Sequence, residues 1–377
     1  MTTDLHIERI KAEKLTEPQR ELWSEMRRHN PALYSPYFHP DYTQLVSQLQ
    51  NDVYIAIISQ MGETVGFLPF QQRRQNASAR PVGAPMTDYH GIISRAETKI
   101  NVEDILKAAQ ISAFHMPSQM NSQRSEDGLD ISDCCVMRLT DFESPQAWRD
   151  SRDSSYRRHL KSTRRRIKKT ESEHGKRSFI WQSQDQSYFD LLTQWKKEKF
   201  SDTGKYDVLS VDWTLGLLKT LWERGPKAGL RCDLHVMMVS GKPAAMDLGL
   251  TDGTTFHSWI VGYDNALHTL SPGMQLLETL IDQAPEIGYE NIDLGAGLGG
   301  YKKNYASWPH TAISQTYTGA GLSAKQAQLY GKLETFGQDK LKDIPGKLRR
   351  RYSQISACDS SFSGQARAML KAIKNGG

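Results

Sequence analysis

Four side chains in the last third of the sequence have the types that proton transfer requires. Asp293 interrupts a short apolar run, where a carboxylate is either paired or held at a raised pKa in a cleft. His257 stands in another strand-like run and is a second candidate base, although a histidine satisfied within its sheet has the same pattern. Tyr301 and Lys302 follow a glycine-rich loop that can bend freely, so either can reach a reacting group. We predict that these four residues are catalytic, with Tyr301 as the acid and the choice of base left open.

The elements that must position these residues follow one another closely along the chain. Two tight-turn compositions, Ser-Gly-Lys-Pro and Thr-Asp-Gly, favour antiparallel hairpins. They join three strand-like runs, which lie at 234–239, 244–250 and 254–261. Apolar residues then recur at helical spacing from position 276 until Gly288 can end the helix, and a short strand follows at 291–294. We therefore expect an antiparallel meander, one amphipathic helix and a fourth strand in the same sheet.

The start of that helix has the composition of an anion-binding corner. Ser271 is a preferred N-cap residue, and Pro272 suits the first turn because it has no N–H to leave unpaired. Backbone N–H groups and the helix dipole favour an anion there, and Gly273 has no side chain to hinder its approach. The corner is predicted to bind the pyrophosphate of a ligand. An ordinary capped helix start is the alternative.

The order of these elements resembles the acetyl-CoA-binding half of the GNAT acyltransferases. The closer resemblance is to the CelD/BcsL-like branch, which is associated with bacterial cellulose and exopolysaccharide synthesis. It rests on Gly-Lys-Pro-Ala-Ala at 241–245, Gly-Tyr-Asp at 262–264, Ser-Pro-Gly at 271–273, Gly288, and Asp-Leu-Gly-Ala-Gly at 293–297 with Tyr301 and Lys302.

The resemblance implies that acetyl-CoA or another acyl-CoA is the co-substrate. Its binding would fall on the residues that match the turn and the start of the helix, namely His268, Ser271, Pro272, Gly273 and Met274. The common GNAT turn begins with Arg or Gln and carries two small residues, whereas the matching run here begins with His268. Acyl-CoA binding is therefore implied by the branch and not by the common motif.

Composition describes a soluble globular protein of ordinary size. The 377 residues suffice for two domains, with 38% hydrophobic and 24% charged residues. The four cysteines form no disulfide framework and no metal-ligand pairs, since Cys134 and Cys135 are adjacent. No basic leader and no apolar run long enough to span a membrane is visible, so we expect a cytoplasmic protein without a metal. The net charge of +5 mildly favours anionic ligands.

A hairpin followed by a helix occurs in both halves of the chain, which suggests two related lobes, as in the Fem peptidyltransferases. The expected fold class is α/β (α+β), with tandem GNAT-like lobes that are each a mixed, mostly antiparallel sheet flanked by helices. We expect a degenerate first lobe at 1–150, a basic connecting helix at 151–178, an acyl-CoA-binding lobe at 179–320 and a basic helical tail at 321–377. Other expected helices lie at 18–29, before 49, at 188–200 and at 211–223, and other strands at 53–59, 64–71, from 179, and at 311–318.

Four further residues are predicted to bind the acceptor substrate. Asp88 and His90 stand two apart in an extended segment, so a carboxylate beside an imidazole could form an acid–base pair, although a polar turn looks the same. Trp195 and Lys196 lie near one face of the helix at 188–200. The polar loop that follows at 199–207 resembles a segment that covers the acceptor in GNAT-like enzymes, with a plain connector as the alternative.

The run at 157–169 contains eight arginines and lysines and no acid among its thirteen residues. Tyr156, Leu160, Thr163 and Ile167 recur at helical spacing, which indicates a packing stripe on a cationic helix. We favour a solvated helix, with a docking surface for an anionic polymer, membrane or acidic protein as the second interpretation. Nucleic acid is disfavoured because no recognisable reading helix or stacking motif lies beside the run.

A glycine pattern at 295–300 matches the dinucleotide fingerprint G-x-G-x-x-G after a strand. The following residues are polar and meet Pro309 within nine positions, which leaves little room for the helix that a dinucleotide site requires. We interpret this segment as a flexible loop lining the site.

Together these observations predict an acyl-CoA-dependent acyltransferase that acts on an amine or hydroxyl of a sugar-related acceptor in polysaccharide formation. A Fem-like transferase that uses aminoacyl-tRNA is one alternative. A binding subunit that has lost catalysis is the other.

Overall fold

The computed structural model describes residues 5–120, 130–203, 205–319, 351–352 and 354–358 of the chain. The tail expected at 321–377 therefore lies almost entirely outside the described residues. No helix in the described part of the chain is long and apolar enough to cross a membrane.

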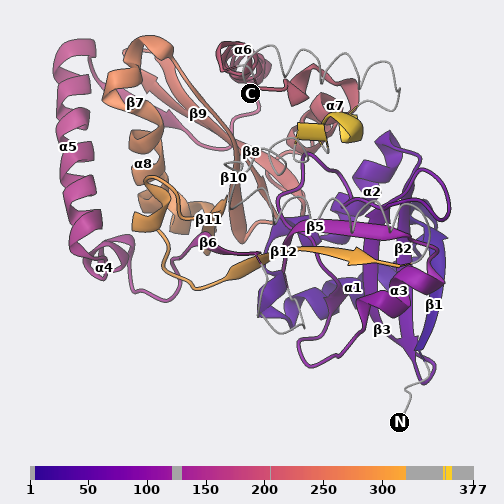
Figure 1. Cartoon of the computed structure of the whole chain (residues 1–377). Helices are drawn as coiled ribbons and strands as arrows, with labels where there is room; N and C mark the ends of the chain where they lie inside the picture. The colour runs from indigo at the N-terminus through magenta and orange to yellow at the C-terminus, as the bar shows by residue number, and fades with distance from the viewer. Residues whose placement is uncertain (1–4, 121–129, 204, 320–350, 353, 359–377) are drawn as a thin grey trace, which may run out of the picture. The chain divides into compact units, whose positions relative to one another are not determined.

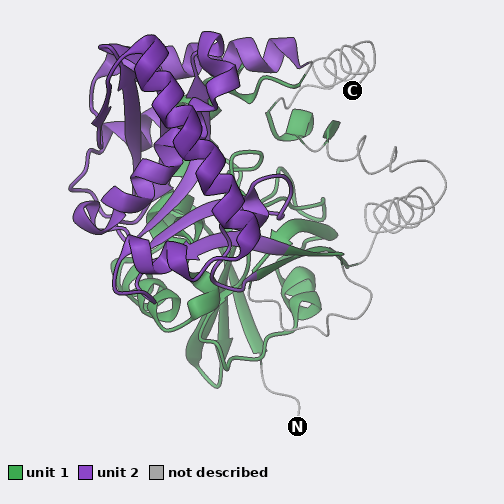
Figure 2. Ribbon diagram, turned by 90° about the vertical axis from the view of Figure 1, so that its left-hand side faces the viewer, with its two compact units in different colours: residues 1–132, 204–217, 311–377 green, residues 133–203, 218–310 purple. Residues whose placement is uncertain are grey.

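The chain divides into two compact units (Figure 2). Unit 1 comprises residues 1–132, 204–217 and 311–377, and unit 2 comprises 133–203 and 218–310. The domain boundaries expected at 150, 178 and 320 stay predictions. Each unit is described by itself below.

Unit 1 contains a four-stranded antiparallel sheet in the order β1-β2-β3-β4 (Figure 1). Its strands are β1 (Leu5–Lys11), β2 (Val53–Gln60), β3 (Glu63–Gln71) and β4 (Ile93–Ser94). The unit also contains β5 (Ala113–Gln119) and β12 (Thr311–Thr318), which pair antiparallel. The helices are α1 (Glu17–Arg28), α2 (Pro40–Leu49) and α3 (Val102–Ala108). The predicted hairpin at 53–71, the helices ending near 29 and 49 and the strand at 311–318 are thus confirmed.

Unit 2 is built on a mixed sheet in the order β6-β11-β10-β9-β8-β7. Its strands are β6 (Asp130–Arg138), β7 (Arg177–Ile180), β8 (Arg231–Val239), β9 (Lys242–Thr251), β10 (Thr255–Tyr263) and β11 (Asn291–Ala296). The start of β6, up to position 132, belongs to unit 1. Its helices are α4 (Pro145–Asp150), α5 (Ser154–His174), α6 (Gln186–Asp202) and α8 (Pro272–Ile287), while α7 (Asp212–Glu223) has residues in both units.

The meander predicted from the sequence is formed by β8, β9 and β10, which pair antiparallel. Ser240 and Gly241 both have left-handed backbone angles, with φ of 48° and 75°, and Val239 pairs with Lys242 across them. A two-residue loop with two positive φ angles matches the right-handed twist of the strands that it joins. The local sequence therefore sets the register of this hairpin.

Helices cover both faces of this sheet. A side chain added at Gly262 would meet Leu192 and Trp195 of α6, whereas Val261 lies against Gly273 of α8. Successive residues of a strand point to opposite faces. Hence α6 and α8 pack on opposite faces of β10.

Helix α5 lies alongside α8 (Figure 1). The Asp153 carboxylate caps its start by accepting from the Tyr156 amide at 2.8 Å. The buried stripe repeats every seven residues and consists of Tyr156, Thr163 and Thr170. The predicted stripe was right for Tyr156 and Thr163 and missed Thr170. The predicted members Leu160 and Ile167 are only half-buried, because they flank the seam.

Candidate active site

The parallel pair β10 and β11 separates partway along its length. Pairing is formed at Thr255–Asn291, Phe256–Ile292 and His257–Asp293, after which β10 continues beside β9 and β11 beside β6. A bulge between Ser258 and Ile260 shifts the register of β10 against β9 just beyond that point. Bulges re-aim side chains and are frequent next to active sites. The candidate site is built around this parting of the strands.

His257 and Asp293 form the last pair before the strands part. The His257 Nδ1 lies 3.2 Å from Asp293 Oδ2, and both side chains are fully buried. The other carboxylate oxygen, Asp293 Oδ1, accepts from the Gly295 amide at 2.7 Å. The structure thus brings together two predicted catalytic residues on neighbouring strands. Their catalytic roles stay predictions.

Asp247, which sequence reasoning missed, lies beside them on β9. Its Oδ2 accepts a hydrogen bond from the Ser258 hydroxyl at 2.7 Å. Its Oδ1 is buried and has no hydrogen-bond partner among the described residues. Burial raises the pKa of Asp247 to about 7, while the Ser258 hydrogen bond and the charges of His257 and Lys196 act in the opposite direction. This carboxyl group can therefore exchange a proton near neutral pH.

Tyr301 lies at the same site and remains reachable from solvent. Its side chain is 42% exposed, and its ring contacts Tyr305 edge-on. Partial burial, reinforced by the nearby Asp247 carboxylate, raises the pKa of Tyr301 above its usual value. The phenol is therefore protonated at neutral pH and can donate its proton.

Lys302 and Cys135 complete this side of the site. The backbone oxygen of Lys302 accepts from the Cys135 thiol at 3.1 Å. Burial raises the pKa of Cys135 to about 12, so it is a neutral thiol and a poor nucleophile.

Of the two acceptor-binding residues predicted on α6, Lys196 reaches this site. Its ammonium donates to the Val261 carbonyl at 3.3 Å, and its charge lowers the pKa of Asp247 against the effect of burial. Trp195 lies against β10 at the position of Gly262. The structure thus places these two side chains beside β10, and their role in binding an acceptor stays a prediction.

The corner before α8 has the backbone groups for an anion but no capping hydrogen bond from a side chain. Ser271 is the N-cap residue of α8, as predicted, but it adopts a left-handed conformation with φ of 51° and its side chain forms no capping hydrogen bond. The amides of Met274 and Gln275 both donate hydrogen bonds to the Ser271 carbonyl. The Gly273 amide has no backbone acceptor among the described residues. An amide left open at a helix start fits a diphosphate.

His268 belongs to the 3-10 turn at Asn265–Leu270 that leads into this corner. Its Nδ1 lies 3.1 Å from the Asn265 carbonyl, and the side chain is exposed. Pro272 is buried in the first turn of α8, as its fixed φ favours. The predicted cofactor-binding residues are therefore contiguous on one corner of unit 2, and the binding itself stays a prediction.

Asp88 and His90 lie in unit 1 and have different surroundings. Asp88 is exposed, whereas His90 is buried at 8% exposure, and their role as an acid–base pair for the acceptor stays a prediction. Burial lowers the pKa of His90 to about 3, although the Asp88 charge opposes this shift. Neither ring nitrogen of His90 has a hydrogen-bond partner among the described residues.

The glycine-rich segment after β11 is a loop, as predicted. A three-residue 3-10 turn at Lys302–Asn304 follows it, where a dinucleotide site would need a longer helix. Within the described ranges, no cluster of three or more His, Cys, Asp or Glu side chains could hold a metal ion.

Part of the chain that forms this site is similar to a known protein family. Residues 156–303 match the model of the acetyltransferase (GNAT) domain. The chain has a GNAT-like α/β fold. Its sheets are mixed and flanked by helices, as predicted.

Similarity to a solved structure supports the fold. The FemX crystal structure is 10% identical, with a TM-score of 0.50, and the match covers 85% of this chain and 99% of that one. A tandem GNAT protein from the clavulanic acid biosynthesis pathway is 10% identical, with a TM-score of 0.47 and coverage of 85% and 100%. The C-terminal domain of a putative lysylphosphatidylglycerol synthetase from Agrobacterium fabrum is 13% identical, with a TM-score of 0.47 and coverage of 82% and 94%. A search of curated protein sequences gives no significant match.

Proposed function

We propose that this protein is an acyl-CoA-dependent acyltransferase of the GNAT type. One observation carries the proposal: a buried carboxylate that titrates near neutrality, Asp247, has an unpaired oxygen where β10 and β11 part. A proton acceptor at such a position suits abstraction from an amine or hydroxyl. The open amide of Gly273, on the helix that follows β10, supplies a place for the diphosphate of the co-substrate.

The base is Asp247 rather than Asp293. Both Asp293 oxygens are already engaged, one near His257 and one by the Gly295 amide, and the side chain is fully buried. Asp247 keeps one oxygen for a ligand, and Ser258 fixes the orientation of the other. His257 and Asp293 then act as positioning residues that hold the strands together up to the point of parting.

When bound, acyl-CoA supplies an activated thioester carbonyl. Asp247 takes the proton of the acceptor amine or hydroxyl as the new bond to the acyl carbon forms. Tyr301 gives its proton to the sulfur as the carbon–sulfur bond breaks. The raised pKa of Tyr301 keeps that proton on the phenol until it is needed. Asp247 then returns its proton to solvent, and Tyr301 regains one.

The acceptor is proposed from the sequence resemblance alone. The motifs at 241–245, 262–264 and 293–297 support a sugar-related acceptor and a role in polysaccharide or cellulose biosynthesis, in the manner of the CelD/BcsL-like branch. Lys196 and Trp195 are proposed to contact the acceptor, since both lie beside β10 on α6. A cytoplasmic location is part of the same proposal.

Calorimetric titration of the full chain with acetyl-CoA tests the proposal. We expect micromolar binding that Gly273→Phe abolishes and Gly273→Ala largely retains. A Cβ at Gly273 would lie 3.6 Å from Val261 Cγ1, which is ordinary contact, so the alanine variant tests whether the site tolerates a methyl group. Thermal unfolding of both variants separates lost binding from lost folding.

The same titration separates the alternatives. Binding of charged tRNA with steep salt dependence, without binding of acetyl-CoA, would replace the proposal by a Fem-like aminoacyl-tRNA-dependent transferase. Acetyl-CoA binding without transfer to any amino sugar would favour a binding subunit. Absence of acetyl-CoA binding to a folded chain would remove the acyl-CoA proposal.

A further inference from the structure

The outward side of α5 carries a dense group of cations that the proposed reaction does not use. It is formed by six exposed side chains, here called the basic face: Arg157, Arg158, Lys161, Arg164, Arg165 and Lys168. No carboxylate of the described residues forms an ion pair with any of them. Along the helix, the nearest acids are Asp153 before it and Glu171 after it.

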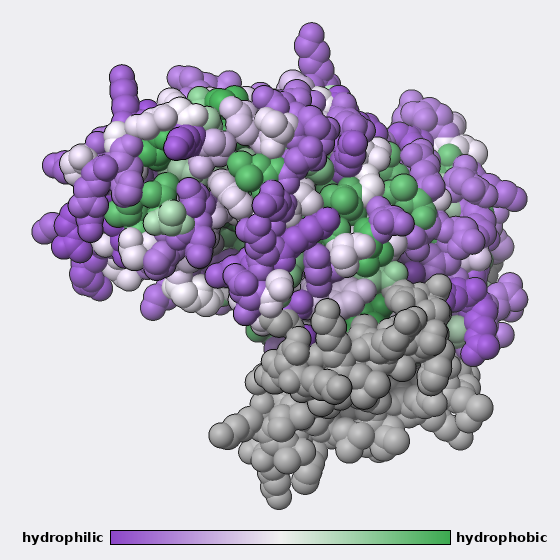
Figure 3. Space-filling view, turned by 90° about the horizontal axis from the view of Figure 1, so that it is seen from above, coloured by the Kyte–Doolittle hydropathy of each residue, from purple (hydrophilic) through white to green (hydrophobic). Residues whose placement is uncertain are grey.

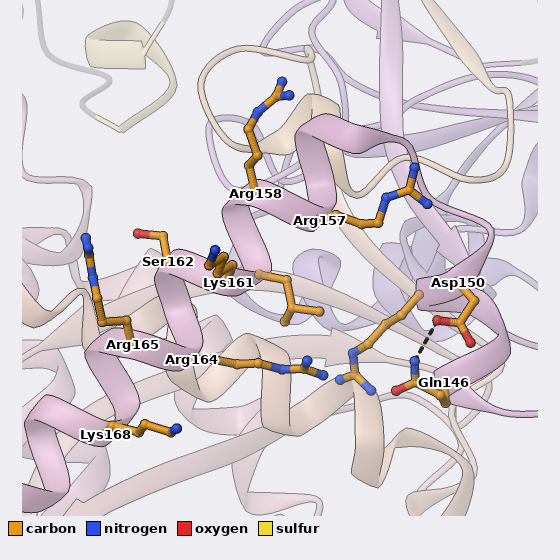
Figure 4. A pocket seen from close by; sticks show the side chains of 11 residues that line it. Gln146, Asp150, Arg157, Arg158, Lys161, Ser162, Arg164, Arg165 and Lys168 are labelled. Carbon is orange, nitrogen blue, oxygen red and sulfur yellow. Dashed lines mark hydrogen bonds between the residues drawn. The ribbon is translucent and has the colours of Figure 1, made fainter.

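The basic face consists of two adjacent stripes. Arg157, Lys161, Arg164 and Lys168 recur at helical spacing and span about 16 Å along the axis at 1.5 Å per residue. Figure 4 shows Arg157, Arg164 and Lys168 extending toward α4, while Arg158 and Arg165 extend the other way. Neighbouring like charges at this spacing destabilise a helix. Fold stability alone therefore gives no reason for the arrangement.

A hollow of about 790 Å³ lies between the basic face and α4. Leu160 and Arg149 line it together with Gln146 and Asp150, which are hydrogen-bonded to each other (Figure 4). The Arg149 charge is already balanced, because its guanidinium pairs with Glu278 and Asp282. The six cations of the basic face are thus the ones available to an external anion.

We propose that the basic face of α5 binds the surface of an anionic lipid bilayer. Clusters of four to eight lysines and arginines on one helix attract anionic phospholipids, and each cation near the surface adds to the binding. Four of the six are arginines, whose planar guanidinium donates two parallel hydrogen bonds to phosphate oxygens. The hollow beside α4 offers room for a headgroup between the cationic side chains.

The composition of the surface favours a bilayer over other anionic partners. No aromatic side chain lines the hollow, whereas single-stranded nucleic acid is held by stacking and protein interfaces are anchored by tyrosine or tryptophan. Asp153 and Glu171 bound the basic face, so a nucleic-acid strand following the helix would meet repulsion at both ends. A bilayer would contact only the side of α5 that carries the basic face.

The contact would be electrostatic rather than inserted. On the molecular face in Figure 3, hydrophobic residues occur in small groups separated by hydrophilic ones. The apolar residues of α5, Leu160 and Ile167, are half-buried, and Leu160 packs against the core of unit 2. Binding should therefore require anionic lipid and weaken steeply as salt is added.

Vesicle flotation of the full chain tests the proposal. The probes are vesicles of phosphatidylcholine alone and of phosphatidylcholine mixed with phosphatidylglycerol. We expect the chain to float only with the anionic vesicles at low salt. The variant Arg157→Gln/Lys161→Gln/Arg164→Gln/Lys168→Gln should lower the partition coefficient by roughly two to three orders of magnitude. These side chains are exposed, so the variant should fold, which circular dichroism checks.

A matched control removes the same charge elsewhere. The variant Lys107→Gln/Lys199→Gln/Lys227→Gln/Lys242→Gln loses four exposed cations outside the basic face and should float nearly as well as the unaltered chain. Equal loss in both variants would reduce the effect to net charge and overturn the proposal. So would no flotation at low salt, or binding of double-stranded RNA that the α5 variant abolishes while vesicles are ignored. None of these outcomes depends on acetyl-CoA, so the acyltransferase proposal stands or falls separately.

Discussion

At the scale of single residues, Asp247 couples the candidate chemistry to stability. Its pKa is raised by burial from 3.8 to about 7. Between these values the folded chain binds a proton that the unfolded chain releases. The free energy of unfolding therefore falls as the pH rises through this window, because ionisation of the buried group opposes folding. The same group that can accept a proton near neutrality is a source of instability above it.

We predict that Asp247→Asn stabilises the protein and inactivates it. The amide keeps the size of the side chain and a hydrogen bond to Ser258 but cannot ionise. At pH 8 the variant should exceed the unaltered chain in free energy of unfolding by roughly 2–4 kcal/mol, with the difference vanishing near pH 4. Acyl transfer should fall by roughly 10²–10⁴-fold. Urea denaturation at both pH values and a rate assay provide the measurements.

The exposed Asp130→Asn is the matched control and should change neither quantity. In the unaltered chain, the rate should rise with pH through about 7 as Asp247 loses its proton. A variant at Asp247 that keeps this profile and rate would exclude the residue as the base.

His90 gives the opposite pH dependence in unit 1. Burial lowers its pKa from 6.5 to about 3, so the stability contributed by the neutral ring is complete above pH 6.5 and is lost as the pH falls toward 3. We predict that the free energy of unfolding of His90→Phe falls by about 2 kcal/mol less than that of the unaltered chain when the pH is lowered from 7 to 5. Denaturant titrations at the two pH values measure this difference. His29→Phe, at an exposed position, should leave the pH dependence unchanged, and parallel curves for His90→Phe would contradict the prediction.

Sequence reasoning found Asp293 and not Asp247, although both carry the same signal. Each is a carboxylate inside an apolar strand-like run, which is costly unless the group is paired or functional. Only tertiary structure shows that Asp293 has partners for both oxygens while Asp247 keeps one open. A pattern in one strand does not reveal what the neighbouring strand presents to it.

At the scale of elements, the predicted meander, helix and returning strand were right because their signals are local. Paired turn residues fix the β8–β9 hairpin, and the apolar repeat and Gly288 fix α8. Strands β1, β5 and β6 were missed. The strand β5 contains Pro117, and β6 begins with polar residues, so their composition does not favour strands. Distant partners hold them in place, as β12 does for β5.

The contact between α6 and β10 gives a prediction at this scale. A methyl group at Gly262 would lie 2.6 Å from Leu192 Cδ1 and 3.4 Å from Trp195, so either the Leu192 side chain or α6 would have to shift. Gly262→Ala should lower the free energy of unfolding by about 1–3 kcal/mol, measured by chemical denaturation. Gly299→Ala is the control, since nothing lies within 4 Å of the added carbon and stability should hardly change. Equal stability of the two variants would show that α6 does not pack closely on β10 in solution.

At the scale of the whole molecule, the match to the GNAT domain falls mainly on unit 2. It covers 156–303, and only 204–217 of that stretch belong to unit 1. The proposed acyl-CoA contacts lie in unit 2, and so does the proposed base. His90 lies in unit 1. A co-substrate bound as proposed should therefore stabilise the two units unequally.

Hydrogen exchange of the full chain with and without acetyl-CoA measures that difference. A ligand at a hundred times its dissociation constant stabilises the state that binds it by about 2.7 kcal/mol. Amides of β10 and the first turns of α8 should exchange more slowly by up to roughly a hundredfold, because their opening releases the ligand. The β2–β3 hairpin of unit 1 should be unaffected if its opening does not disturb unit 2.

Pantetheine, which lacks the diphosphate, should protect far less at the same concentration, since the Gly273 amide would have no anion to bind. Equal protection by both compounds would place the binding energy outside this corner, and equal protection of both units would mean that they open as one.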